Sequence, residues 1–131
     1  MASQSRRAMR INHVGELGED SINMIRGLES LGAEIQISDG MISVSATSGT
    51  FPCAPEKCID IGNSGTGCRF MLALASSMGS VSEITGDISL RSRPFEVITG
   101  ALADLGCSVS RTEGGGLVVS GPAVPGKVAL D

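Results

Sequence analysis

The stretch "EVITGALADLGCSVSRTEGGGLVVS", residues 96–120, decides the fold because its pattern occurs twice in the chain. The earlier copy is "INMIRGLESLGAEIQISDGMISVS", residues 22–45. In both copies, apolar residues spaced at i, i+4 and i+7 form one face of a helix that stops at a glycine. A short alternating strand, a turn signal and a second strand follow. The sequence therefore predicts one unit, helix-strand-turn-strand, that is present twice.

The two copies align position by position when Gly32 is placed on Gly106. Units of this kind cannot bury their helical faces alone, so they stack on their neighbours. The apolar pairs that the alignment creates are Met24 with Ile98, Leu28 with Leu102, Leu31 with Leu105, Ile42 with Leu117 and Val44 with Val119.

The residues between the two copies carry further regular structure. Alternation and turn signals predict a strand over 58–62, a helix over 64–79 with Ser64 or Thr66 near its cap, and a strand over 80–86. A loop over 87–94 then delivers Pro94 into the first turn of the next helix. We therefore predict an α+β fold of repeated β-α-β-α-β-β units, with roughly one and a half to two units present.

Composition excludes several classes of function. Of the 131 residues, 41% are hydrophobic, but only three are Phe and none is Trp or Tyr, so the core must be aliphatic. A net charge of −4 and 2% aromatic residues argue against a nucleic-acid-binding surface. The longest apolar run, "FMLALA", is too short to cross a bilayer, and no basic-then-apolar leader opens the chain. We expect a soluble, cytoplasmic protein with no membrane or nucleic-acid partner.

The cysteine pattern does not favour a metal site. Cys53 and Cys58 form a CxxxxC spacing, Cys68 and Cys107 stand apart, and His13 is the only histidine. Zinc sites need closer pairs and more ligands than these residues supply. We expect no metal and no cofactor, and four thiols in a reducing compartment.

Two loops are candidates for anion binding. In "GNSGTGCRF", residues 62–70, a glycine-rich turn between strand and helix exposes backbone N–H groups at the positive end of the helix dipole, and Arg69 follows about one turn later. In "SLRSRP", residues 89–94, Arg91 and Arg93 offer planar forks that fit phosphate and carboxylate. From the residues alone, an ordinary capped helix and an ordinary solvated loop remain the alternatives, and Asp87 is close enough to pair with either arginine.

These loops together resemble one family, the 5-enolpyruvylshikimate-3-phosphate synthases. "GNSGTGCRF" is similar to that family's Asn-(Ala/Ser)-Gly-Thr-x-x-Arg loop, and "GDISLRSRP" to its Gly-(Asp/Glu)-x-x-(Leu/Met)-x-x-Arg-Pro loop. "SQSRRAM", residues 3–9, resembles the part of the family's Lys-Ser-x-Ser-x-Arg-Ala-Leu segment after the lysine. The family has two domains of three β-α-β-α-β-β units each, so the resemblance implies the internal repeat.

The resemblance also implies site residues and substrates. Phosphoenolpyruvate would contact Gly65 and Arg93, while shikimate 3-phosphate would contact Ser3 and Arg7. The family moves the enolpyruvyl group of phosphoenolpyruvate to the 5-hydroxyl of shikimate 3-phosphate without a cofactor, and glyphosate occupies its phosphoenolpyruvate site. The residues expected to shape or support the loop are Asn63, Thr66 and Arg69.

Departures from the family pattern shape our remaining expectations. Ala2 stands where the family has its lysine, and the segment from Arg7 to Asp20 is shorter than in the family. We expect residues 1–56 to be an abbreviated first repeat, 57–121 a complete repeat and 122–131 the start of a third. The catalytic acid and base are expected in the remainder of the synthase, so no catalytic residue is assigned and the isolated chain is expected to be inactive.

Two alternatives stay open at this point. One is a piece of the related enzyme that transfers enolpyruvate to a UDP-amino sugar. The other is a non-catalytic module that keeps the fold to bind anions or to serve as structure.

Overall fold

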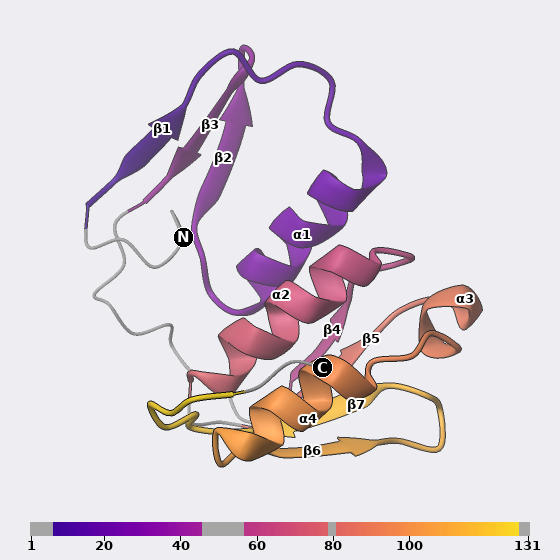
Figure 1. The fold of residues 1–131 in the computed structure, drawn as a ribbon. Coiled ribbons are helices and arrows are strands. Elements are labelled where there is room, and N and C mark those ends of the chain that lie inside the picture. Colours follow the sequence, from indigo (N-terminus) through magenta and orange to yellow (C-terminus); the bar gives the residue numbers. More distant parts are fainter. Residues whose placement is uncertain (1–6, 46–56, 79–80, 129–131) are drawn as a thin grey trace.

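A computed structural model of the chain describes residues 7–45, 57–78 and 81–128. Two sheets and four helices make up this part of the chain (Figure 1). The smaller sheet has the strand order β1-β3-β2, with β1 at Met9–Ile11, β2 at Ile35–Ser38 and β3 at Met41–Val44. The larger has the order β4-β5-β7-β6, with β4 at Lys57–Asp60, β5 at Val81–Thr85, β6 at Ser108–Arg111 and β7 at Leu117–Ser120.

The helices connect these strands in a repeated order. Helix α1 spans Glu19–Ser30, α2 spans Gly65–Ser76, α3 spans Ile88–Arg91 and α4 spans Glu96–Asp104. The order α1-β2-β3 recurs as α4-β6-β7, which confirms the predicted unit. Gly32 and Gly106, which follow α1 and α4, both have positive φ, 97° and 86°, a conformation that favours glycine at a helix end.

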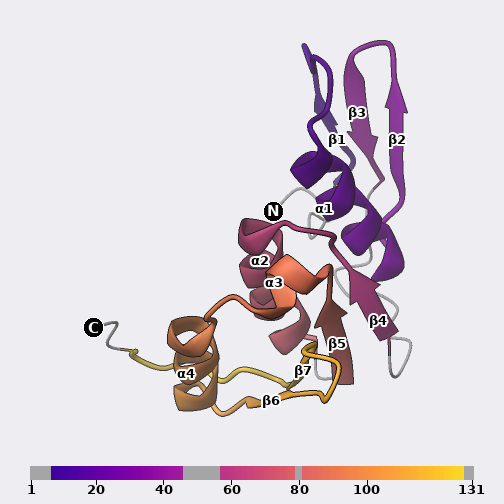
Figure 2. The same cartoon turned by 90° about the vertical axis from the view of Figure 1, so that its right-hand side faces the viewer.

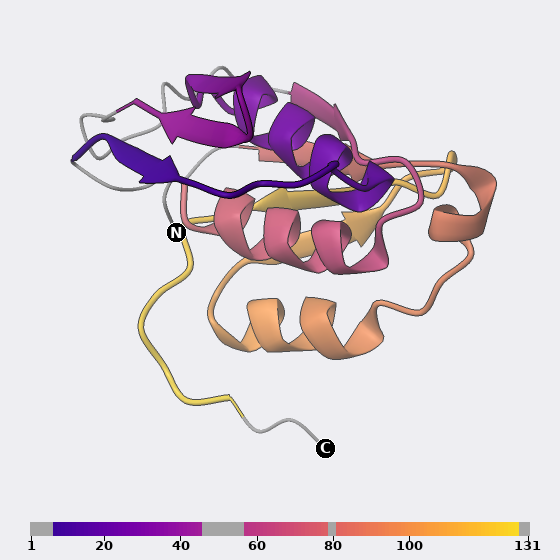
Figure 3. The ribbon, with the colours of Figure 1, turned by 90° about the horizontal axis from the view of Figure 1, so that it is seen from above.

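The larger sheet contains the crossover that positions the candidate loops. Strands β4 and β5 are parallel and are joined through α2, whereas β7 runs antiparallel to both β5 and β6. Helices α2 and α4 lie side by side on one face of this sheet (Figures 2 and 3). The carboxyl ends of β4 and β5 therefore open at the same edge, next to the start of α2.

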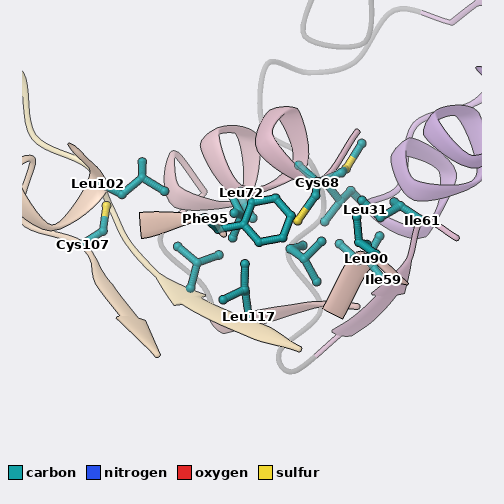
Figure 4. Close-up of a cluster of buried hydrophobic side chains, with 14 of the residues drawn as sticks. Leu31, Ile59, Ile61, Cys68, Leu72, Leu90, Phe95, Leu102, Cys107 and Leu117 are labelled. Atoms are coloured by element: carbon teal, nitrogen blue, oxygen red, sulfur yellow. The ribbon is translucent and has the colours of Figure 1, made fainter. Parts of the chain in front are cut away.

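The core lies between that face of the sheet and helices α1, α2 and α4, and it is mainly aliphatic, as composition requires. Phe95 is the aromatic member of the cluster (Figure 4). Full burial of one large apolar side chain stabilises the fold by about 1.5–3 kcal/mol. Side chains that are fully buried there include Ile59, Ile61, Leu72, Ile84 and Val119.

Two local expectations were wrong, and one strand was not predicted. Residues 87–94 are not simply a loop, because Asp87 caps the short helix α3 by accepting a 2.7 Å hydrogen bond from the amide of Leu90. Pro94 does not enter the first turn of the next helix, because Phe95 precedes α4 and inserts its ring into the core. Strand β1, which the repeat pattern did not predict, pairs antiparallel with β3.

Within the described ranges, no helix is long and apolar enough to cross a membrane.

Candidate anion-binding site

The two candidate loops meet at the carboxyl ends of β4 and β5. The amide of Asp87 donates a 3.0 Å hydrogen bond to the carbonyl of Gly62. A Cβ at Gly86 would collide with that same carbonyl, so only glycine allows the two backbones to approach this closely. In open α/β sheets, ligands bind outside the carboxyl ends of parallel strands, which is where these loops lie.

Helix α2 begins at the junction with an ordinary side-chain cap. The hydroxyl of Ser64 accepts a 3.0 Å hydrogen bond from the amide of Gly67, which confirms Ser64 as the cap. The first amide groups of a helix have no partner within it and carry partial positive charge. The start of α2 therefore supplies N–H donors at the same edge as the two loops.

Gly65 leaves room for two guanidinium groups. A Cβ built at Gly65 would lie 2.5 Å from Nη1 of Arg93 and 3.4 Å from Nη1 of Arg69. The first of these separations is shorter than any real Cβ contact, so a side chain at this position would displace Arg93. Glycine at this position therefore lets the Arg93 guanidinium keep its observed place.

Each guanidinium near Gly65 is held by an oxygen of the first loop. Arg93 donates from Nη2 to Oδ1 of Asn63 over 2.6 Å, although the two residues are 30 positions apart. Arg69 donates from Nη1 to the carbonyl of Gly65 over 2.9 Å, and its Cζ lies 5.0 Å from the centroid of the Phe95 ring. A cation over an aromatic face is attracted by the ring quadrupole, so Phe95 helps to orient Arg69.

A second pair of arginines holds the backbone of the Arg-Pro loop. Arg91 donates from Nε to the carbonyl of Gly86 over 2.6 Å. This bond stabilises the loop that contains Arg91, so its guanidinium is already engaged by the backbone. Arg111 donates from Nη1 to the carbonyl of Arg91 over 2.6 Å and from Nη2 to the carbonyl of Arg93 over 3.3 Å. Arg111 thereby fixes the segment that carries Arg93.

Within the described part of the chain, the two arginines beside Gly65 have no carboxylate partner. Across residues 7–45, 57–78 and 81–128, neither Arg69 nor Arg93 forms a salt bridge, since their contacts are the amide and carbonyl oxygens already named. Asp87, which could have paired with either arginine of its loop, caps α3 instead. Arg69 is exposed and Arg93 half-buried. Two fixed cations without counter-ions form a site suited to a small anion.

Cys68 lies directly behind this edge as a neutral thiol. It is buried in the core beside Phe95 (Figure 4). Burial raises the pKa of Cys68 to about 11, against a smaller lowering by Arg69 and Arg111. The thiol is therefore a packing group and not a nucleophile at neutral pH. No cluster of three or more His, Cys, Asp or Glu side chains suited to a metal occurs among the described residues.

The chain matches the family model described as EPSP synthase (3-phosphoshikimate 1-carboxyvinyltransferase) over residues 7–127. The chain belongs to the EPSP synthase family. A 3-phosphoshikimate 1-carboxyvinyltransferase from Methanococcoides burtonii is 38% identical over 114 residues, which cover 85% of this chain and 26% of that protein. Its counterpart from Methanobrevibacter smithii is 38% identical over 98 residues, covering 75% of this chain and 22% of that protein.

A solved structure of the same family supports the fold. The EPSP synthase from Acinetobacter baumannii superimposes with a TM-score of 0.80 at 26% sequence identity, over 92% of this chain and 28% of that one. The likeness confirms the predicted α+β architecture of repeated enolpyruvyl transferase units. The chain thus spans about a quarter of the length of the EPSP synthases that it matches.

The structure brings together most of the residues that the resemblance singled out. Gly65, Arg93, Asn63 and Arg69 form one cluster, and Thr66 lies exposed in the first turn of α2 beside them. Arg7 is exposed just ahead of β1, and Ser3 and Ala2 lie outside the described residues.

Sequence reasoning missed Arg111 and Phe95. Arg111 ends β6 and pairs in register with Leu117, so in sequence it is a charged residue at a hairpin turn and nothing marks it as a support for a distant loop. Phe95 has a clearer signal, because it is one of only three phenylalanines and directly follows the Arg-Pro pair.

Proposed function

We propose that this chain supplies the phosphoenolpyruvate-binding edge of a 3-phosphoshikimate 1-carboxyvinyltransferase. One observation carries the proposal: Arg93 and Arg69 converge on Gly65 at the start of α2 with no carboxylate partner in the described chain. Family membership supports the same assignment.

The chemistry of the ligand fits the cluster. Phosphoenolpyruvate carries a phosphate and a carboxylate on three carbons, so it needs closely spaced, fixed donors. Arg93 presents a planar fork whose orientation is set by Asn63, and the first amides of α2 add N–H donors. Gly65 permits the ligand to approach the backbone, while Arg69 and Thr66 shape the loop beside it. Donors fixed before binding cost little reorganisation when the anion arrives.

The reaction that we propose for the whole protein transfers the enolpyruvyl group to shikimate 3-phosphate. The 5-hydroxyl of that substrate gives up its proton as its oxygen bonds to the central carbon of phosphoenolpyruvate, whose methylene carbon is protonated to a methyl group. The C–O bond to phosphate then breaks, phosphate leaves with its bridging oxygen, and the methyl group loses a proton as the double bond of the enol ether product forms. Positioning of two polyanions by arginines supplies much of the catalysis. We assign Ser3 and Arg7 to shikimate 3-phosphate.

The length of the chain relative to the family indicates which part of the site it supplies. The chain spans 22% and 26% of two relatives, so we place the proton-transfer groups in the remaining length of the family's polypeptide. Within the chain, we propose an abbreviated repeat over 1–56, a complete repeat over 57–121 and the start of another over 122–131. The isolated chain should bind phosphoenolpyruvate without turning it over.

A chimera tests this function directly. The stretch of the Methanococcoides burtonii enzyme that aligns with residues 57–121 would be replaced by those residues, and phosphate release from phosphoenolpyruvate and shikimate 3-phosphate would be measured. We expect an active chimera that loses activity with Arg93→Met. A folded chimera that is inactive and does not bind phosphoenolpyruvate would favour the non-catalytic module. The UDP-amino-sugar alternative is not favoured, because the relatives named above are 3-phosphoshikimate enzymes.

A further inference from the structure

Helix α1 packs against β4 and α2 through one polar residue and one glycine (Figure 2). Asn23 and Gly27 are the buried residues of this helix, and they lie one turn apart on the same face. At Gly27 the contact is apolar, since a Cβ there would lie 3.2 Å from Cε of Met71 and 3.3 Å from Cγ2 of Ile59. At Asn23 the helix presents a polar side chain that is only 7% exposed. A buried polar side chain is the feature of this face that needs a physical explanation.

Asn23 lies directly behind the first of the two candidate loops. A Cβ built at Gly62 would lie 2.5 Å from Nδ2 and 3.3 Å from Cγ of Asn23. The amide of Asn23 therefore occupies the space that a side chain at Gly62 would need. Gly62 also has a φ of 58°, in the left-handed region. Both its backbone conformation and its contact with Asn23 therefore favour glycine at this position.

The backbone of Gly62 is held from three directions. Its amide donates a 2.8 Å hydrogen bond to Oδ1 of Asp60, and its carbonyl accepts a 3.0 Å bond from the amide of Asp87. The side chain from α1 closes the third direction, at Cα. The next residue in the chain is Asn63, whose Oδ1 orients the guanidinium of Arg93. A movement of Gly62 would therefore move the group that holds Arg93.

We infer that Asn23 is a positioning residue for phosphoenolpyruvate binding, which acts from α1 on Arg93 through the backbone of Gly62 and Asn63. This inference rests on the function proposed above for the Arg93 cluster. Protein interiors are close-packed, so removing atoms behind a loop leaves a space into which the loop relaxes. The two hydrogen bonds of Gly62 leave its Cα side open, and Asn23 blocks movement in that direction. Packing of α1 thus helps to set the orientation of a guanidinium far along the chain.

A truncation and a substitution of similar shape test this role in the full chain. Asn23→Ala removes the amide behind Gly62, and isothermal titration should show phosphoenolpyruvate binding roughly three- to fivefold more weakly. Asn23→Leu has as many side-chain heavy atoms as the parent and the same branching, so it refills the space. We expect it to restore the affinity to within about twofold of the parent. Gly27→Ala is the matched control, because it changes the packing of α1 one turn away without touching Gly62. It should leave the affinity within about twofold, whatever its effect on the thermal midpoint.

Two further measurements identify the route from Asn23 to the site. If Asn23 acts through Asn63, then Asn23→Ala should have little further effect on affinity in the Asn63→Ala background. Amide hydrogen exchange at Asp87, whose amide bonds to the carbonyl of Gly62, should also become faster in Asn23→Ala. The exchange rate at Asp87 requires no ligand, so it reports on the loop independently of phosphoenolpyruvate.

The possible results separate this inference from the proposed function. A parent chain that does not bind phosphoenolpyruvate overturns the proposed function, and with it this role in binding. A parent that binds, together with unchanged affinity in Asn23→Ala, overturns the positioning role alone. Strictly additive losses from Asn23→Ala and Asn63→Ala, or a loss that Asn23→Leu does not restore, also overturn the positioning role.

Discussion

Arg93 donates a 2.6 Å hydrogen bond from Nη2 to Oδ1 of Asn63, which joins the loop after β5 to the loop after β4. The bond fixes the orientation of a guanidinium that forms no salt bridge in the described chain. A preorganised cation of this kind loses little side-chain entropy when it binds an anion. We therefore expect anion binding at this site to depend on the orientation of the Arg93 guanidinium as much as on its charge.

Arg93→Lys separates these two contributions. Lysine keeps the charge but cannot present a planar fork, so we expect phosphoenolpyruvate to bind about tenfold more weakly. Asn63→Ala keeps the guanidinium of Arg93 but removes the hydrogen bond that orients it. We expect this substitution to weaken binding by a smaller factor of roughly three to ten. Isothermal titration measures both. If Asn63→Ala leaves binding unchanged, orientation by that amide is not important.

Gly65→Ala should impair the site while sparing the fold. The added methyl would lie 2.5 Å from Nη1 of Arg93, so the guanidinium must move away. This movement costs little because the guanidinium is the flexible end of a long side chain. We expect weaker phosphoenolpyruvate binding and a nearly unchanged thermal midpoint. Gly100→Ala is the control, because a Cβ there meets nothing within 4 Å, and it should stabilise α4 by about 0.5–1 kcal/mol without affecting binding. Equal effects of the two substitutions on binding would contradict the packing explanation.

Arg111→Met tests a positioning role. Its guanidinium donates to the carbonyls of Arg91 and Arg93, so its loss should loosen the segment that carries Arg93 and weaken anion binding several-fold. A double-mutant cycle with Arg93→Met distinguishes positioning from general destabilisation, because residues that act through one another give non-additive effects. Strict additivity would show that Arg111 acts independently of Arg93.

The pKa of Cys68 predicts how stability changes at alkaline pH. The pKa of this thiol is about 11 in the folded chain against 9.0 for an ordinary thiol, so the unfolded chain loses its proton first as the pH rises. The stability contributed by the neutral buried thiol is complete below about pH 9 and is lost towards about pH 11. Denaturant unfolding of the parent and Cys68→Ala should show their difference in stability narrowing across this interval. A constant difference would contradict the shift.

Local patterns predicted most of the fold because the helix-strand-turn-strand pattern occurs twice in the sequence. Gly32 and Gly106 end their helices as expected, and Ser64 caps α2. The pattern failed where a tertiary contact decided the structure: Phe95 inserts into the core and delays α4 beyond Pro94. Strand β1 is only three residues long and forms by pairing with β3. Three residues are too few to show the alternating pattern that would predict a strand.

The candidate site was predictable only through motifs. The sequence places Gly65 and Arg93 almost thirty residues apart, and their contact arises because β4 and β5 are adjacent parallel strands. Arg111 could not be foreseen, since its role is to hold backbone carbonyls that sequence does not distinguish.

Titration of the chain with phosphoenolpyruvate, followed by amide chemical shifts, tests the central claim most directly. We predict saturable shifts at millimolar ligand or below that are concentrated at Gly65, Thr66 and Arg93 and are lost with Arg93→Met. An absence of shifts at these amides at millimolar phosphoenolpyruvate, or shifts that persist in the Arg93→Met variant, would contradict it.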